Sequence, residues 1–226
     1  MSIATNLNNI KKKIPQQVTL VAVSKTKPVS DVMEAYEAGQ RIFGENKIQE
    51  MTEKYEQMPK DIEWHMIGHV QTNKVKYMAP FVSLIHGVDS LKLLQEINKQ
   101  AAKNNRVIPC LLQIHIAEEE TKFGLDEVEL HEMLKQVQHD KETFRNIKII
   151  GLMGMATFTN NQSQIQKEFQ HLKALFDTSK KHFDSALCET IDLNILSIGM
   201  SGDYELAISC GSTMVRIGSS IFGNRN

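Results

Sequence analysis

The sequence has almost no excess charge of either sign. It contains 26 Lys plus Arg against 27 Asp plus Glu, which gives a formal net charge of −1 at pH 7. Proteins that bind nucleic acids or anionic membrane surfaces without specificity need a broad positive field, and this balance does not supply one. We therefore expect no nucleic acid and no membrane among the partners of this protein.

Glycine, proline and cysteine are also scarce. The 12 glycines and 5 prolines make up about 8% of the 226 residues, below the roughly 12% of average usage, so little room remains for linkers between domains. The three cysteines are widely spaced with no CxxC pair, which argues against a disulfide framework and a zinc ribbon. These shortages predict one domain over residues 1–226 in a reducing compartment, the cytoplasm.

Long hydrophobic runs are missing as well. No run approaches the ~18 apolar residues of a membrane span, and residues 1–15 lack the apolar segment of a signal peptide. The lysine run at residues 11–13 is typical of a solvated helix face rather than a targeting arm.

The chain does contain short apolar runs that alternate with amphipathic stretches. Eight runs predict strands, at residues 18–23, 41–43, 62–67, 82–86, 107–116, 147–153, 193–198 and 213–217. Seven of them are followed by a stretch with helical spacing, at residues 31–38, 46–57, 72–78, 90 onward, 126–139, 162–182 and 203–209. Ser30 is predicted to cap the first of these helices, and a further helix is expected at residues 2–13.

This alternation predicts an α/β protein with a parallel sheet. Runs that are apolar on both faces fit strands covered by helices. Eight units in about 220 residues match a single (β/α)₈ TIM-type barrel better than a doubly wound sheet of five or six strands.

In such a barrel the functional site lies at the carboxyl ends of the strands, so the residues that follow each run are the candidates. Ser201 and Gly202 follow the seventh run, and Gly218 and Ser219 follow the eighth. Glycines permit close backbone approach and hydroxyls donate hydrogen bonds, which suits a phosphate. The alternative is a pair of ordinary loops with a serine cap, and the spacing by itself does not decide between them.

Two basic residues lie near the same ends. Lys25 follows the first run, where an apolar surrounding would disfavour its ammonium form and leave an amine nucleophile; the alternative is a solvated lysine. Arg216 lies inside the eighth run, where a charge needs either a structural salt bridge or a bound group. His65 and His69 have the spacing of helical metal ligands, but the strand end between them points them apart, so we predict no metal site.

Five segments together resemble the pyridoxal phosphate homeostasis protein family, whose barrel is similar to the N-terminal domain of alanine racemase. They are residues 21–28 (VAVSKTKP), 43–50 (FGENKIQE), 64–74 (WHMIGHVQTNK), 151–153 (GLM) and 196–223. The motifs occur in order and span nearly the whole chain. Lys47 and residues 157–159 depart from the family pattern, but neither lies in the lysine or phosphate motif.

The resemblance implies a barrel that binds pyridoxal 5′-phosphate (PLP) as a Schiff base. Lys25 resembles the Schiff-base lysine, and Arg216 looks like the arginine that faces the pyridine nitrogen, where a cation weakens the electron sink. The remaining positions that match the cofactor-binding residues of the family are Asn46, Ser201, Gly202, Gly218 and Ser219.

The resemblance also frames the choice between carrier and enzyme. Alanine racemases use a lysine and a tyrosine from a second domain as their two bases, and we expect 226 residues to leave no room for that domain. The first hypothesis is therefore a monomeric protein without catalytic residues that stores, buffers or delivers PLP to apo-enzymes. The second is a small racemase or lyase with His65 or Tyr204 as the other base, although Tyr204 is expected to face outward. The third is a barrel that binds no aldehyde cofactor.

Overall fold

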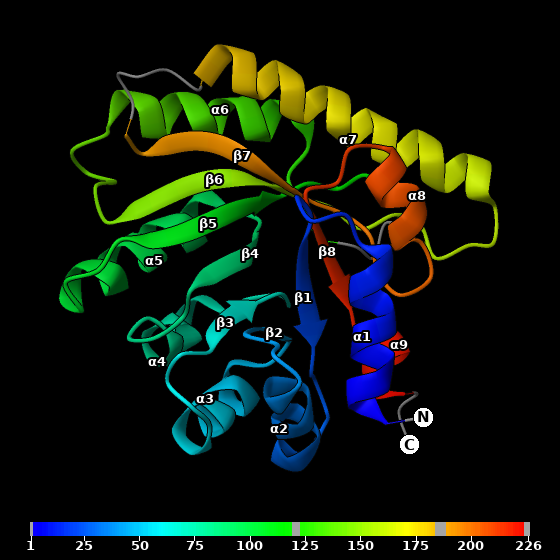
Figure 1. The fold of residues 1–226 in the computed structure, drawn as a ribbon. Coiled ribbons are helices and arrows are strands. Elements are labelled where there is room, and N and C mark those ends of the chain that lie inside the picture. Colours follow the sequence, from blue (N-terminus) through cyan, green and yellow to red (C-terminus); the bar gives the residue numbers. More distant parts are fainter. Residues whose placement is uncertain (1, 119–122, 184–188, 224–226) are drawn as a thin grey trace.

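The computed structural model describes residues 2–118, 123–183 and 189–223. Within this part, the strands pair in parallel in the order of the chain, and β8 pairs with β1, so the sheet closes into a barrel (Figure 1). The strands are β1 (Thr19–Val23), β2 (Ile42–Glu45), β3 (Glu63–Met66), β4 (Leu84–Val88), β5 (Ile108–Gln113), β6 (Ile147–Met153), β7 (Ile191–Ser197) and β8 (Met214–Ile217). The predicted (β/α)₈ barrel is confirmed.

Helices follow the strands around the outside of the barrel (Figure 1). They are α1 (Ile3–Lys13), α2 (Val29–Glu37), α3 (Ile48–Gln57), the 3₁₀ helix η1 (Thr72–Lys74), α4 (Val75–Met78), α5 (Leu91–Lys103), α6 (Glu127–His139), α7 (Gln162–Phe183), α8 (Tyr204–Ser209) and α9 (Ser219–Phe222). The first and last helices lie side by side, and Asn6 of α1 donates to the carbonyl of Ile221 at 3.1 Å. None of the helices in the described ranges is both long and apolar enough to cross a membrane.

Capping residues explain where two of the helices begin. The hydroxyl of Ser90 accepts from the N–H of Leu93 and starts α5. Asp126 and Glu129 form a reciprocal capping box at α6, in which each side chain accepts from the other residue's backbone N–H. Both helices therefore start within a residue of the positions that the sequence predicts.

Two expectations about helices were wrong. The first predicted helix is not capped by Ser30, because α2 already begins at Val29 with Pro28 in the cap position. The eighth strand also has a helix after it, α9, whose four residues are too few to give a periodic signal. The first helix thus begins earlier than the spacing of its side chains indicates, and the last helix is too short for such spacing to show.

Strand alternation decides which residues face the inside of the barrel. A small cluster of buried side chains comes from five different strands, as the inward faces of a closed barrel require, and consists of Val21, Leu84, Leu111, Met153 and Met214. Side chains on one face of a strand recur every second residue. The positions two and four residues after a member of this cluster therefore continue the same inward face toward the carboxyl end of the barrel. Arg216 lies two residues after Met214, and Lys25 four residues after Val21.

Candidate functional site

A cavity of about 780 Å³ lies where the strands end. It is lined by every residue that the sequence analysis matched to a cofactor position: Lys25, Asn46, Ser201, Gly202, Arg216, Gly218 and Ser219. These residues come from β8 and from the segments that follow β1, β2, β7 and β8. The fold thus gathers residues almost 200 positions apart around one space.

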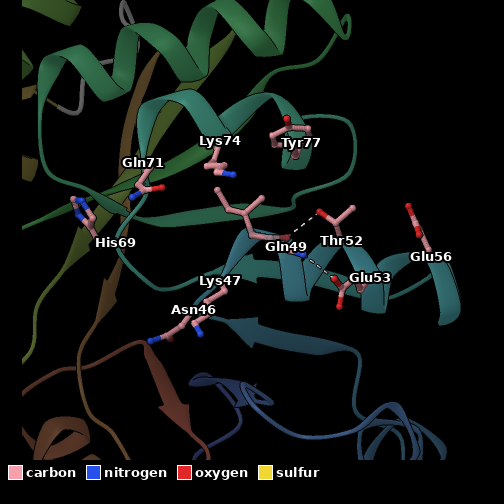
Figure 2. A pocket seen from close by; sticks show the side chains of 11 residues that line it. Asn46, Lys47, Gln49, Thr52, Glu53, Glu56, His69, Gln71, Lys74 and Tyr77 are labelled. Carbon is pink, nitrogen blue, oxygen red and sulfur yellow. Dashed lines mark hydrogen bonds between the residues drawn. The ribbon is translucent and has the colours of Figure 1, made fainter.

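A groove of about 540 Å³ adjoins this cavity, and the two share Asn46 and His69. Figure 2 shows the side chains that line the groove. The groove runs between α3 and the η1–α4 segment, with Lys47 near the shared end and Glu56 near the far end. Lys47, one of the two departures from the family pattern, therefore lines the groove and not the cavity. The other departure, residues 157–159, lines the cavity itself.

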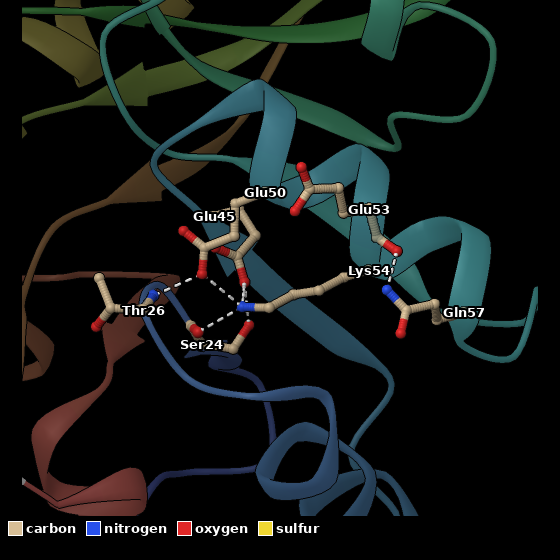
Figure 3. A network of polar contacts seen from close by, with 7 residues as sticks. All are labelled: Ser24, Thr26, Glu45, Glu50, Glu53, Lys54 and Gln57. Atoms are coloured by element: carbon tan, nitrogen blue, oxygen red, sulfur yellow. Dashed lines mark hydrogen bonds and ion pairs between the residues drawn. The ribbon is translucent and has the colours of Figure 1, made fainter.

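The turn that carries Lys25 is fixed on both sides by one polar network (Figure 3). The Nζ of Lys54 donates to the carbonyl oxygen of Ser24 at 2.8 Å, and the backbone N–H of Thr26 donates to the Oε1 of Glu50 at 2.6 Å. Thr26 has a φ of 65°, a left-handed conformation that a non-glycine residue adopts only when its surroundings impose it. The network therefore holds the peptide units before and after Lys25.

Glu45 and Lys54 form the buried centre of this network. The Nζ of Lys54 lies 2.7 Å from the Oε1 of Glu45, and their side chains are 5% and 0% exposed. The hydroxyl of Ser24 donates to the same carboxylate oxygen at 2.6 Å, and Lys54 also contacts Glu50. Burial raises the pKa of the Glu45 carboxyl, and the Lys54 ammonium opposes that rise.

Two serine–glycine turns, which follow β7 and β8, form one side of the cavity. The N–H of Gly218 donates to the hydroxyl of Ser201 at 3.2 Å, which ties the two turns together. A Cβ added at Gly218 would lie 3.1 Å from the carbonyl oxygen of Val23, so a larger residue would crowd the chain next to Lys25. Within the described residues, the backbone N–H groups of Gly202 and Ser219 have no protein acceptor, so they are available to an anion in the cavity.

Arg216 is 4% exposed and has neutral oxygen atoms as its partners. Its Nη1 donates to the carbonyl and to the hydroxyl of Ser197, both at 2.7 Å, and its Nη2 donates to the carbonyl of Gly154 at 3.0 Å. Burial lowers the pKa of Arg216 to about 10, and the charge of Asp203 opposes this. At neutral pH the side chain is still a cation, held by hydrogen bonds rather than by the structural salt bridge that was one of its two expected roles.

His65 and Tyr204, the two side chains considered as a second base, do not line the cavity. His65 is buried and its Nδ1 lies 3.1 Å from the Nε2 of His86. Tyr204 was expected to face outward, and this was wrong: it is 6% exposed and packs in the main core, with its hydroxyl donating to Glu205. The short helix α8 is pressed against the barrel, so its first residue is covered.

His69 lies apart from His65. Its Nδ1 is 3.0 Å from the carboxylate of Asp89, and its ring stacks on Phe123 with the ring centroids 4.2 Å apart. Both rings line the cavity, as does Phe158, which is 93% exposed. These rim residues were not identified as site residues from the sequence, because their neighbours come from different loops.

Comparison with known proteins defines the class of this barrel. A family model described as the N-terminal domain of alanine racemase matches residues 1–226. Alanine racemase from Bartonella henselae shares the fold, with a TM-score of 0.69 at 15% identity over 99% of this chain and 60% of that chain. The chain is thus a barrel of the alanine racemase N-terminal type, with a lysine, an arginine and two serine–glycine turns at its mouth.

More similar proteins specify the family. The pyridoxal phosphate homeostasis protein of Aquifex aeolicus is 39% identical over 91% of this chain and 86% of its own length, and that of Haemophilus influenzae is 37% identical over 100% and 97%. PipY of Synechococcus elongatus with PLP bound is 31% identical, with a TM-score of 0.87 over 98% of this chain and 100% of that chain. The chain belongs to the pyridoxal phosphate homeostasis protein family.

Proposed function

We propose that this protein binds PLP in the cavity and serves the homeostasis of this cofactor inside the cell. One observation carries the proposal: a single cavity unites an amine, a buried guanidinium and two tied serine–glycine turns. These groups match the aldehyde, the ring nitrogen and the phosphate of PLP. The relatives named for this role and the PLP-bound PipY structure support the assignment.

The residues present fit the cofactor. The open N–H groups of Gly202 and Ser219, together with the serine hydroxyls, suit a phosphate. Lys25 provides the amine that condenses with an aldehyde: the nitrogen–carbon bond forms, and the aldehyde oxygen leaves as water. Asn46 lines the wall between cavity and groove. When bound, PLP supplies a reactive aldehyde and an electron-withdrawing ring.

The reversibility of this condensation suits a carrier. Water restores the aldehyde and frees Lys25, so the same bond that holds the cofactor also releases it. Arg216 presents a fixed positive charge, which disfavours a proton on a nearby ring nitrogen and weakens the electron sink that racemases and lyases use. We therefore propose storage, buffering or delivery rather than catalysis, and His65 and Tyr204 do not supply the cavity with a second base.

The wider setting of this role is also part of the proposal. We propose that the protein is a monomer, and sedimentation equilibrium of the loaded protein tests that state. We further propose that the protein acts in the cytoplasm and passes PLP to PLP-dependent apo-enzymes.

Borohydride reduction of the PLP-loaded protein tests the central assignment. We expect a pyridoxyl label on Lys25 and loss of that label in Lys25→Ala, because the lysine supplies the nitrogen of the bond that is reduced. Lys76→Ala, which removes an exposed lysine on α4, is the matched control and should keep the label. A wild-type label on any other lysine, found by peptide mapping, would contradict the assignment.

A second measurement separates carrier from enzyme. The loaded protein is incubated with single amino acids in deuterated water, and exchange of the α-hydrogen is followed by mass spectrometry. We expect no exchange above that of free PLP. Exchange at ordinary enzyme rates, about 1–1000 per second, would replace the carrier proposal with the racemase or lyase.

A further inference from the structure

A chain of buried polar side chains runs from Arg216 into the barrel. The hydroxyl of Ser197 contacts the Nδ1 of His86 at 3.2 Å, and the Nε2 of His86 contacts the Nδ1 of His65 at 3.1 Å. Ser197 and His86 are 0% exposed, and His65 and Arg216 are 4% exposed. The four residues belong to β7, β4, β3 and β8, so they cross the barrel interior directly beneath the cavity.

The chemistry of the donors gives this chain a direction. A guanidinium has only donors, so the Ser197 hydroxyl must accept from the Nη1 of Arg216. Within the described residues, the one hydroxyl proton then has a single acceptor, the Nδ1 of His86. A neutral imidazole that accepts at Nδ1 carries its proton on Nε2, and that proton points at the Nδ1 of His65.

We propose that Ser197, His86 and His65 are positioning residues for Arg216, which they hold through a one-way chain of hydrogen bonds that fixes both imidazoles as Nε2–H tautomers. The inference rests on the proposed function only where it concerns the cofactor. The reverse direction would leave the buried Ser197 proton without an acceptor, which is costly in a protein interior.

The charges in the chain agree with this direction. Burial lowers the pKa of His65 to about 3, and burial, reinforced by the neighbouring His65 and the Arg216 guanidinium, lowers the pKa of His86 well below its usual value. Both rings are therefore neutral at physiological pH, and the guanidinium is the only cation of the four. The hydrogen-bond chain therefore holds Arg216 in one orientation without adding a second positive charge beneath the cavity.

The hydrogen-bond count of Arg216 shows what the orientation is for. A guanidinium has five N–H groups, and the bonds to Ser197 and Gly154 use three of them. Within the described part of the chain, the other two have no protein acceptor, and Arg216 lines the cavity. Two N–H groups of Arg216, held in a fixed orientation, are thus left to donate to an acceptor in the cavity, such as the ring nitrogen of PLP.

Nitrogen NMR of the protein without PLP tests the chain directly. With ¹⁵N-labelled histidine at neutral pH, we expect His86 and His65 both to appear as Nε2–H tautomers. In Ser197→Ala, which leaves Arg216 two carbonyl acceptors and so keeps its fold, the His86 resonances should shift. Either an Nδ1–H tautomer at His86 in the wild type or unchanged His86 resonances in Ser197→Ala would overturn the proposal.

The effect on the site is measured with PLP labelled by ¹⁵N in its ring. We expect Ser197→Ala to raise the dissociation constant for PLP roughly tenfold and to shift the ring-nitrogen resonance. Ser209→Ala, which removes an exposed hydroxyl bonded to Leu206, should change neither. Equal behaviour of the two variants overturns the positioning role. If the wild type binds no PLP, the proposed function fails. The histidine tautomers, which are measured without PLP, still test the hydrogen-bond chain.

Discussion

Lys54 illustrates at the residue scale how a side chain outside the cavity acts on it. Its ammonium contacts Glu45, Glu50 and the carbonyl of Ser24, and Ser24 precedes the proposed Schiff-base lysine. Removing one partner of a buried ion pair costs far more than the pair contributes to stability, because a charge is left without compensation. The buried carboxylate of Glu45 is the charge that would be left.

We predict that Lys54→Met lowers the free energy of unfolding by about 3–5 kcal/mol at pH 7. Urea unfolding followed by circular dichroism measures the loss. Lys99→Met is the matched control, since Lys99 pairs with Glu96 at the surface, where an ion pair contributes little. A loss in Lys54→Met no larger than in this control would contradict the role of the buried pair.

The same variant has a pH dependence whose sign follows from Glu45. Burial raises the pKa of Glu45 in the folded protein above its unfolded value. In Lys54→Met the ammonium that opposes this rise is absent, so the pKa of Glu45 rises further. A group with a raised folded pKa contributes stability below its unfolded pKa and loses it as the pH rises through the folded pKa. The difference in stability between wild type and Lys54→Met should therefore be smallest near pH 4 and grow toward pH 7.

At the scale of elements, the contact between β6 and β7 depends on one glycine. A Cβ added at Gly151 would lie 1.9 Å from the carbonyl oxygen of Ile195, and the register between the strands shifts just before this pair. The backbone carbonyl of Ile195 cannot move aside for this Cβ as the end of a flexible side chain could. The absence of a side chain at Gly151 is thus what lets β7 approach, and β7 carries Ser197 toward Arg216.

We predict that Gly151→Ala lowers the free energy of unfolding by about 3 kcal/mol. Gly202→Ala is the control for stability, because a Cβ there meets nothing within 4 Å, and it should change the free energy of unfolding by about 0.5 kcal/mol or less. Both values come from chemical denaturation. Similar losses in the two variants would show that the close approach of β7 is not what Gly151 provides.

At the scale of the whole molecule, closure of the barrel brings distant parts of the chain together around the cavity. The residues that line the cavity come from β8 and from the segments after β1, β2, β3, β5, β6, β7 and β8, among other elements, so a ligand that spans the cavity contacts distant parts of the chain at once. Any ligand that binds the folded state and not the unfolded chain stabilises the fold by mass action. Cofactor binding should therefore stabilise the entire barrel.

We predict that PLP at about 100 times its dissociation constant stabilises the protein by about 2.7 kcal/mol, which raises Tm by roughly 5–10 °C for a chain of this size. Pyridoxal, which keeps the aldehyde but lacks the phosphate, should raise Tm less at the same concentration. Differential scanning calorimetry makes the comparison. An equal rise with both compounds would show that the two serine–glycine turns do not bind the phosphate.

The sequence by itself determined the order of the strands and of the helices other than α9, because hydrophobic periodicity and capping are local properties of the chain. The positions that follow the strands, together with the motifs that resemble the family, were also sufficient to select residues that line one cavity. Only the tertiary structure decided the partners of Arg216 and the burial of Tyr204. Ser197 and His86 are 111 residues apart in the chain, and no local pattern encodes their contact, because it exists only once the eight strands close and bring β4, β7 and β8 around a common interior.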